Sequence, residues 1–432
     1  MLWNRYTPSS SQYRGIKTLK NTAPERGLTN LIHVVDSIMG SGKTQAILRM
    51  INEDTEKGRK WLYITPYLDE VDRVIRECPR QEFVQPQKFG SKSQNFLTLV
   101  REGKNIATTH ALFNYMNGET ASVLRDGGYT LVIDEVLENI AYIPVKEWDE
   151  SIMQNGLISV NEDGAVVWER RNYEGVFDAY KAAAEGGRLY QVESGSYLSI
   201  FPYKFLNNFQ DVYVLTYMFD AQIMRYMLDF NGMSYDKLSA KKTDSGYELI
   251  PYTNAYDHEY YTSRIRILNH DKMNSIGSGY WDLSSTWYKK HASTGEVEQI
   301  GKNCYNFFHN IVHQKSDHCM WTTFKAYQQK ACPRGYKKGF LAQNARATNQ
   351  FADRVAVAYT VNQFMLTPTK MFLQKNGIEV DENAYALSNM IQFIWRSNIR
   401  QGGEVDVYVP SSRMRELLTD FMRGNNHIAE EG

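Results

Sequence analysis

Cysteine is scarce in this sequence, with four residues in 432. They stand far apart, at Cys78, Cys304, Cys319 and Cys332, and none belongs to a Cys-x-x-Cys pair. This spacing argues against a structural zinc site and against a disulfide framework. Sparse, unpaired cysteines are typical of a reducing compartment, so the sequence predicts a cytoplasmic protein.

Long apolar runs are also absent. No stretch of about 18 apolar residues could form a membrane-spanning helix, and the N-terminus lacks the apolar stretch of a secretory signal. A hydrophobic fraction of 42% and a charged fraction of 23% are those of a globular chain with ample core material. We therefore expect a folded protein that has no membrane partner.

The chain has no net charge, because 49 Lys and Arg residues balance 49 Asp and Glu residues. The balance is uneven along the chain. Residues 320–415 contain thirteen basic and six acidic residues, a local charge of +7. A locally basic lobe can hold a phosphate backbone, although a solvated surface explains this charge equally well.

Apolar strands alternate with helical patterns, which indicates parallel sheets covered on both faces. Strands are expected at 31–36, 61–65, 105–109, 130–134 and 211–216, and in a second series at 264–268, 319–323, 339–342 and 405–409. Helices are expected at 45–51 and 68–77. The sequence thus predicts a polar arm (1–28), a first α/β lobe (29–228) with an aromatic-rich insertion or helical excursion at about 140–205, a connection (229–258) and a second α/β lobe (259–432).

A candidate phosphate loop, Ser-Ile-Met-Gly-Ser-Gly-Lys-Thr, lies between a predicted strand and a predicted helix. Its glycines allow backbone N–H groups to close around phosphate oxygens at a helix N-terminus. A lysine would reach the β- and γ-phosphates and the threonine hydroxyl would ligate Mg²⁺. The candidate nucleotide-binding residues are Ser37, Gly40, Ser41, Gly42, Lys43 and Thr44. Ser37 stands where the strict pattern has Gly.

Two carboxylates, Asp134 and Glu135, end another apolar strand. In a doubly wound sheet, this end faces the crevice where ligands bind. Asp134 would hold Mg²⁺, usually through water, and Glu135 would polarise the attacking water. A structural role is common for such a strand end alone, but the phosphate loop favours the catalytic one.

A third group of polar residues lies near the C-terminus. If the segment is helical, Gln392, Arg396 and Arg400 are spaced i, i+4 and i+8 and share one face. Guanidinium groups suit phosphate recognition and can stabilise charge on a transferring phosphoryl group. The pattern leaves open whether Arg396 or Arg400 is the arginine finger; helical facing favours Arg400, with Arg396 nearer the lobe interface. A salt-bridged surface stripe is the alternative.

The ordered set of motifs resembles the superfamily 2 helicases of the DExD/H type, especially compact ones encoded by bacteriophages. The resemblance spans about 30–415. Its segments are 37–44 (motif I), 64–67 (Ia), 107–113 (Ib), 134–137 (II), 215–217 (III), 321–323 (IV), 344–349 (V) and 392–400 (VI). The sequence departs from the family pattern in its Asp-Glu-Val-Leu box and in Trp395, which replaces a usual Gly.

This resemblance implies two RecA-like lobes of the P-loop NTPase fold with ATP and Mg²⁺ between them. It also implies a nucleic-acid strand held across both lobes by its backbone, since short hydroxyls suit phosphate contacts that carry no base information. The implied contacts are Thr65, Thr109 and His110 in the first lobe and Thr323, Arg346 and Thr348 in the second. Trp321 and Trp395 could stack on bases, but we expect buried core positions for both.

The motifs and the resemblance together predict an ATP-dependent DNA helicase or translocase, and the resemblance alone implies a role in phage replication or recombination in the host cytoplasm. Its partner would be single-stranded or forked DNA, with RNA as an alternative, and a replication or loading protein is a candidate second partner. One rival is a nucleic-acid-binding ATPase switch, for instance at a replication origin, without processive unwinding. A small-molecule kinase is a weaker rival, because it does not need a second lobe.

Overall fold

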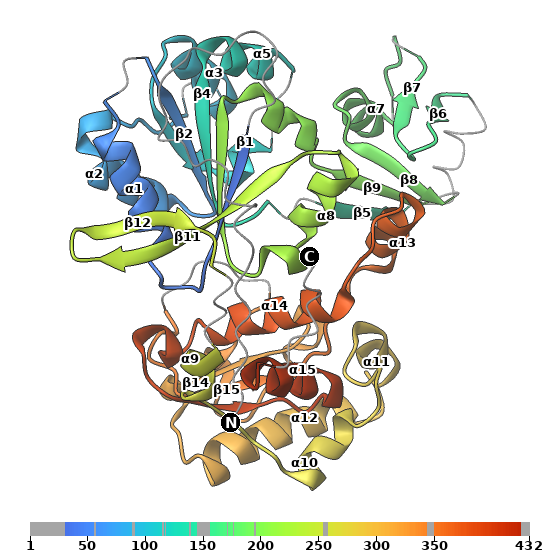
Figure 1. Ribbon diagram of the computed structural model, residues 1–432. Coiled ribbons are helices and arrows are strands. Elements are labelled where there is room, and N and C mark those ends of the chain that lie inside the picture. Colours follow the sequence, from blue (N-terminus) through green and yellow to red (C-terminus); the bar gives the residue numbers. More distant parts are fainter. Residues whose placement is uncertain are drawn as a thin grey trace, which may run out of the picture.

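The computed structural model describes residues 31–424, apart from 56–57, 89–90, 115, 117, 138–139, 145–155, 171, 176, 194–195, 254–257 and 344–349. Two α/β lobes lie one above the other in Figure 1. The predicted arm at 1–28 and the candidate motif at 344–349 lie outside the described residues. The expected fold class, mainly parallel sheets flanked by helices in two lobes, is confirmed.

The first lobe contains a seven-stranded sheet in the order β12-β11-β1-β10-β4-β2-β3. All neighbouring pairs are parallel except β11 and β12. The strands are β1 (Leu31–Asp36), β2 (Lys60–Thr65), β3 (Ile106–Thr109), β4 (Tyr129–Asp134), β10 (Asp211–Thr216), β11 (Tyr235–Thr243) and β12 (Gly246–Pro251). The main helices are α1 (Lys43–Glu53), α2 (Leu68–Glu77), α3 (Lys92–Arg101), α4 (His110–Phe113), α5 (Gly118–Gly127) and α8 (Ile223–Phe230).

Apolar side chains on alternate positions of these strands build a core on each face of the sheet. On one face, Val35 and Tyr63 pack with Ile47 of α1 and Val71 of α2. On the other face, strand residues such as Val34 pack with α3, α5 and α8. Burial on both faces explains why these strands are almost continuously apolar.

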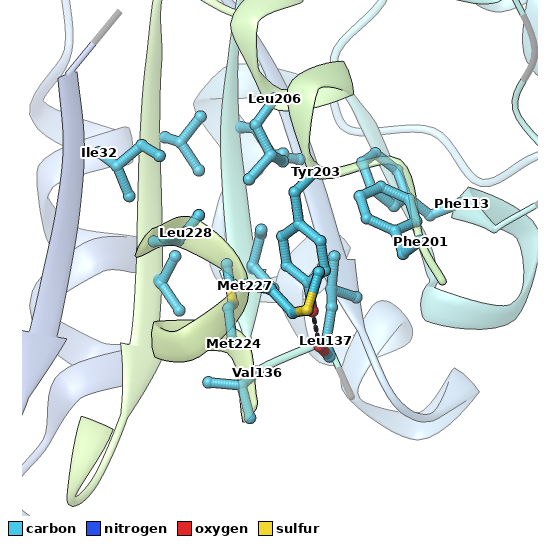
Figure 2. Packing of buried hydrophobic residues seen from close by; sticks show 14 of the residues in the cluster. Ile32, Phe113, Val136, Leu137, Phe201, Tyr203, Leu206, Met224, Met227 and Leu228 are labelled. Carbon is cyan, nitrogen blue, oxygen red and sulfur yellow. Dashed lines mark hydrogen bonds between the residues drawn. The ribbon is translucent and has the colours of Figure 1, made fainter. Parts of the chain in front are cut away.

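A buried tyrosine fixes the chain just after the Asp134–Glu135 pair. Tyr203 packs among the apolar side chains shown in Figure 2, and its hydroxyl donates a hydrogen bond of 2.6 Å to the carbonyl of Leu137. Val136 and Leu137 are themselves buried in this cluster. The core therefore holds the segment that follows the two carboxylates.

The predicted insertion is mostly β structure. It contains a three-stranded antiparallel sheet, β5-β9-β8, and a two-stranded ribbon, β6-β7. The elements are β5 (Ile140–Pro144), β6 (Ile158–Val160), β7 (Val166–Trp168), α7 (Asp178–Glu185), β8 (Leu189–Glu193) and β9 (Ser196–Ile200). The alternative of a helical excursion is wrong, because most of these short segments pair edge to edge.

The segment expected to connect the lobes also carries sheet structure. Strands β11 and β12 lie within 229–258 and form a hairpin at the edge of the first sheet. Their mixed polarity concealed them, since most of their side chains are only half-buried. The first sheet therefore extends beyond the last strand that the sequence predicted for this lobe.

The second lobe is built on a parallel four-stranded sheet, β13-β16-β15-β14. Its strands are β13 (Ile265–Ile267), β14 (Cys319–Thr322), β15 (Ala356–Tyr359) and β16 (Val405–Tyr408). Strand β15 was not predicted, and the strand expected at 339–342 is only an isolated bridge at Phe340. Its helices include α9 (His258–Thr262), α10 (Asp271–Asn274), α11 (Ser285–Lys290), α12 (Glu296–Tyr305), α13 (Thr367–Lys375), α14 (Glu382–Ile394) and α15 (Ser412–Met422).

Helix α13 joins the second lobe to the insertion. Its Phe372 packs edge-on against Tyr190 of β8, with ring centroids 5.2 Å apart.

In the part of the chain that the structure describes, no helix is both long and apolar enough to cross a membrane.

Candidate functional site

The carboxyl ends of β1, β10 and β4 lie side by side and bring the phosphate loop and the two carboxylates to one edge. Strand β10 is tied to both neighbours, because Ser37 N donates to Thr216 O (3.2 Å) and Glu135 N donates to Leu215 O (3.1 Å). With adjacent strands about 4.8 Å apart, the loop and the carboxylates lie two strand spacings from each other.

The candidate phosphate loop turns through two glycines directly before helix α1. Gly40 and Gly42 have φ angles of 79° and 89°, a region that favours glycine, and α1 begins at Lys43. The Lys43 ammonium donates to the carbonyls of Ser37 (2.6 Å) and Ile38 (3.1 Å). The Ser41 hydroxyl is buried without a hydrogen-bond partner among the described residues. A buried, unsatisfied hydroxyl beside a helix N-terminus fits a phosphate oxygen.

Burial shifts the protonation of the charged groups at this edge. It lowers the pKa of Lys43 to about 8, although the carboxylates of Asp36, Asp134 and Glu135 oppose that shift. Burial also raises the pKa of Asp134 to about 7, and the nearby Glu135 adds to this effect. These charges therefore interact within one desolvated site, as active sites often require.

Both carboxylates are held in defined positions. Tyr63 on β2 donates a hydrogen bond of 3.0 Å from its hydroxyl to Asp134 Oδ2. Glu135 has a φ angle of 63°, a left-handed conformation that costs energy for a residue with a side chain. Such strain is often found at functional sites, and here it turns the chain at the end of β4.

Asp36 is a buried carboxylate that the sequence analysis did not single out. It ends β1 directly before the loop, is 3% exposed, and accepts a hydrogen bond of 3.0 Å from Phe219 N. Burial raises its pKa to about 6, and the Phe219 N–H opposes this shift. Asp36 thus joins the loop to the segment after β10. Its place at a strand end, like that of Asp134, was the available signal.

We expect Asp36→Asn to stabilise the protein at high pH. The folded-state pKa exceeds the unfolded value of 3.8, so the aspartate form loses stability as pH rises from about 4 through 6, whereas Asn does not titrate. Because the pKa rises from 3.8 to about 6, the loss of folding free energy at high pH is at most about 3 kcal/mol. In denaturant unfolding, the free energy of unfolding of Asp36→Asn relative to the wild type should increase by about 1 kcal/mol between pH 5 and pH 8.

Asp72→Asn, at an exposed position of α2, is the control for the substitution itself. If the difference in the free energy of unfolding between Asp36→Asn and the wild type stays constant or decreases as pH rises, the burial argument is contradicted.

Two aromatic rings from other elements cover the phosphate loop. A side-chain carbon built on Gly42 would lie 2.0 Å from Tyr247 Cδ1, so the ring of this β12 residue rests directly on the loop. A carbon built on Gly40 would lie 3.0 Å from Trp395 Cζ2, at the end of α14 in the second lobe. The loop therefore lies between the β11–β12 hairpin and the second lobe. No sequence signal pointed to Tyr247.

The predicted single helical face from Gln392 to Arg400 is wrong, because α14 ends at Ile394. Gln392 donates to the Ser388 hydroxyl (3.1 Å). Arg396 is half-buried beyond the helix end, and its Nε donates to Gln392 O (3.3 Å). Arg400 is exposed in a 3-10 turn, Asn398–Gln401. The chain leaves the helical conformation at Ser397, whose backbone is extended and whose hydroxyl donates to the Ile394 carbonyl (2.6 Å).

The candidate nucleic-acid contacts lie at strand ends but differ in exposure. Thr65 and Thr323 are buried, 0% and 1% exposed, and Thr109 and His110 are half-buried where β3 passes into α4. Arg346 and Thr348 lie outside the described residues.

Both tryptophans considered for base stacking are buried, as expected for core positions. Trp321 is 1% exposed and Trp395 is 6% exposed. Neither ring offers a free face on the surface.

The chain resembles known proteins over nearly its whole length. Residues 259–422 match a family model described as the YonV C-terminal Rossmann-like domain. The chain is also 36% identical over 408 residues to the SPbeta prophage-derived protein YonV of Bacillus subtilis (strain 168), covering 90% of this chain and 98% of that one.

Solved structures with a similar arrangement are more distant. The structure of S. tokodaii Xpd4 has a TM-score of 0.47 and 11% identity, and the match covers 90% of this chain and 94% of that chain. The DUF1998 helicase MrfA bound to DNA and AMPPNP has a TM-score of 0.34 and 12% identity, over 91% of this chain and 48% of that chain. Given the extent of its identity to the Bacillus protein, this chain belongs to the YonV family.

Proposed function

We propose that the protein is an ATP-driven DNA helicase or translocase. The observation that carries the proposal is the position of the phosphate loop, which faces the carboxylates of its own sheet and touches the second lobe through Trp395. A nucleotide bound there would contact both lobes. Its affinity would then differ between closed and open arrangements, which is the physical condition for coupling hydrolysis to movement.

The residues present fit a magnesium nucleotide. The loop supplies N–H groups, the Ser41 hydroxyl and the Lys43 ammonium for phosphate oxygens, and Thr44 and Asp134 would hold Mg²⁺. Bound Mg²⁺ would neutralise charge on the phosphates. Glu135, on its left-handed turn, would orient and deprotonate water. Among the described residues no cluster of three His, Cys, Asp or Glu side chains could hold a metal alone, and a magnesium ion shared with phosphates needs fewer protein ligands.

Nucleic acid is the proposed track because the second lobe is locally basic and an arrangement of two stacked α/β lobes suits a strand lying across both. Here the local charge of +7 at 320–415 supplies the attraction to phosphates. The prophage origin of the Bacillus relative favours a role in phage replication or recombination.

The test is the steady-state ATP hydrolysis rate with and without single-stranded DNA or RNA. Strong stimulation by DNA, together with ATP-dependent displacement of a labelled strand or of a bound protein, supports the proposal. A hydrolysis rate that neither DNA nor RNA changes contradicts a motor function. Stimulation by DNA without any displacement favours the alternative of an ATPase switch.

Tyr247 is proposed to support the nucleobase or ribose of ATP. It lies on the side of β1 opposite to the carboxylates, and Arg49 of α1 fixes its hairpin through Glu248 (3.2 Å) and the Ser245 carbonyl (3.2 Å). We expect Tyr247→Ala to raise the KM for ATP by about 5- to 10-fold, the value of one aromatic stacking contact, with kcat nearly unchanged. Tyr247→Phe should retain the wild-type KM.

A drop in kcat without a change in KM would contradict this role. It would indicate instead that the ring shapes the loop itself.

A further inference from the structure

A large cavity in the second lobe lies apart from the phosphate loop. Its volume is about 1110 Å³, and its wall includes residues at the carboxyl ends of β14 and β15, with helices α11, α13 and α14 around it. In parallel α/β sheets this edge is the usual ligand edge. Small-molecule sites typically measure about 300–1,000 Å³, so this space lies at the upper end of that range and has room for a segment of a polymer.

Aromatic rings gather at this cavity. Trp281 is 65% exposed and stacks on Phe364, with ring centroids 4.8 Å apart and an interplanar angle of 28°. Tyr280, 52% exposed, meets Trp281 edge-on. Deeper in the wall, Trp287 stacks on His291 at 4.4 Å. Aromatic faces exposed in this way are surfaces on which nucleobases can stack.

The aromatic group is rigidly anchored. The buried guanidinium of Arg413 lies 4.3 Å from the Phe364 ring centroid and donates to Asn362 Oδ1 (2.9 Å) and Gln363 O (2.8 Å). Asn362 Nδ2 in turn donates to the carbonyls of Tyr280 (2.7 Å) and Asp282 (2.9 Å). The loop that carries Trp281 is therefore fixed to the end of β15, and a pre-organised surface loses little entropy on binding.

Polar atoms in the wall point to the chemistry of the ligand. The side-chain oxygens of Gln343 and Gln363 are buried without hydrogen-bond partners in the described chain. Both are acceptors, and they match the exocyclic and ring N–H donors of nucleobases. Lys290 is exposed at the rim beside the half-buried His291, where either could meet a phosphate.

From this arrangement we infer that the cavity bordered by Trp281, Phe364, Gln343 and Gln363 captures bases of single-stranded nucleic acid. This inference rests on the proposed function, and it adds base contacts to a track otherwise held by its backbone. The site is distinct from the nucleotide site because it lies at the β14–β15 edge and shares no wall residue with the phosphate loop.

The test compares binding of a fluorescein-labelled 15-nucleotide oligothymidine by fluorescence anisotropy at one fixed salt concentration. Trp281→Ala should weaken binding at least about 5-fold, the effect of losing one stacked base, whereas Trp281→Phe should bind like the wild type. Tyr142→Ala, an exposed aromatic on β5 (43% exposed), is the matched control and should not change binding. The basal ATPase rate of every variant should equal that of the wild type.

Two further ligands show whether binding comes from the bases, from the backbone or from a free nucleotide. An oligonucleotide of the same length with abasic sites should bind wild type and Trp281→Ala equally. Thymidine monophosphate should compete poorly with the oligonucleotide. If it competes at concentrations equal to that of the oligonucleotide, the site binds free nucleotides, and the proposal of a single-strand site is overturned.

The two proposals fail differently. If the wild type binds DNA and DNA stimulates its ATPase, but Trp281→Ala behaves identically, the base site is overturned and the motor stands. If the wild type neither binds nor responds to any single strand, both are overturned.

Discussion

Replacing Glu135 with Gln is expected to lower the rate of ATP hydrolysis by about 10²- to 10⁴-fold, the usual contribution of a general base. The amide keeps the size of the side chain and its left-handed backbone at the end of β4, so the site should still fold and bind ATP. Only the ability to accept a proton from water is lost. The measurement is kcat under saturating ATP and single-stranded DNA, with ATP binding followed by a fluorescent nucleotide analogue.

Lys43→Ala provides the contrasting variant. Lys43 is tied to the loop carbonyls of Ser37 and Ile38 before any phosphate arrives, so its loss should weaken nucleotide binding as well as hydrolysis. If Glu135→Gln hydrolyses ATP within about 3-fold of the wild type, Glu135 is not the base, because such a small loss lies well below the range for general catalysis.

Parallel-sheet strands could be predicted well from the sequence because both of their faces are buried. Leu31–Asp36 and Asp211–Thr216 were predicted with their observed bounds, and helix Leu68–Glu77 likewise. Since carboxyl ends of parallel strands share an edge, the meeting of the phosphate loop with Asp134 and Glu135 followed directly from these strands.

Structure that depends on contacts between distant segments could not be predicted. The β11–β12 hairpin has half-exposed faces and no continuous apolar run, so its pairing with β1 left no periodic signal. Tyr247 reaches Gly42 across about two hundred residues of chain, a contact that only tertiary packing defines. The spacing of Gln392, Arg396 and Arg400 also extended α14 too far, because side-chain spacing carries no information on where the backbone leaves the helix, and α14 ends at Ile394.

The link between the lobes is continuous with the proposed nucleotide site. Asp36 accepts from Phe219 N, and neighbouring Met218 and Tyr217 are buried in the second-lobe core together with Trp395. Met218 also has a positive φ of 57°. A movement at the end of β1 would therefore be passed to the segment 217–219, which packs on the second lobe. The proposed closure of the lobes around a nucleotide needs such a contact with both lobes.

The same interface distinguishes the two arginines after α14. Helical spacing favoured Arg400 as the finger, but only Arg396 directly follows the residue that touches the loop. Arg396 also has its Nη1 atom buried, whereas Arg400 is exposed on a turn whose Ile399 carbonyl accepts from the Tyr260 hydroxyl at 2.6 Å. A guanidinium stabilises transition-state charge far more strongly where water is excluded, so we propose Arg396 as the arginine finger.

We expect Arg396→Ala to lower kcat by about 10³-fold or more, the range measured for arginine fingers, while Arg400→Ala lowers it less than about 10-fold. Arg396→Lys should recover little activity, because an ammonium lacks the planar fork of a guanidinium. Thermal unfolding of each variant would separate loss of chemistry from loss of folding. Equal losses for the two alanine variants would mean that the lobes close further than this structure and bring the exposed turn to the phosphates. A loss confined to Arg400→Ala would restore the assignment made from spacing and leave Arg396 as a packing residue beside Trp395.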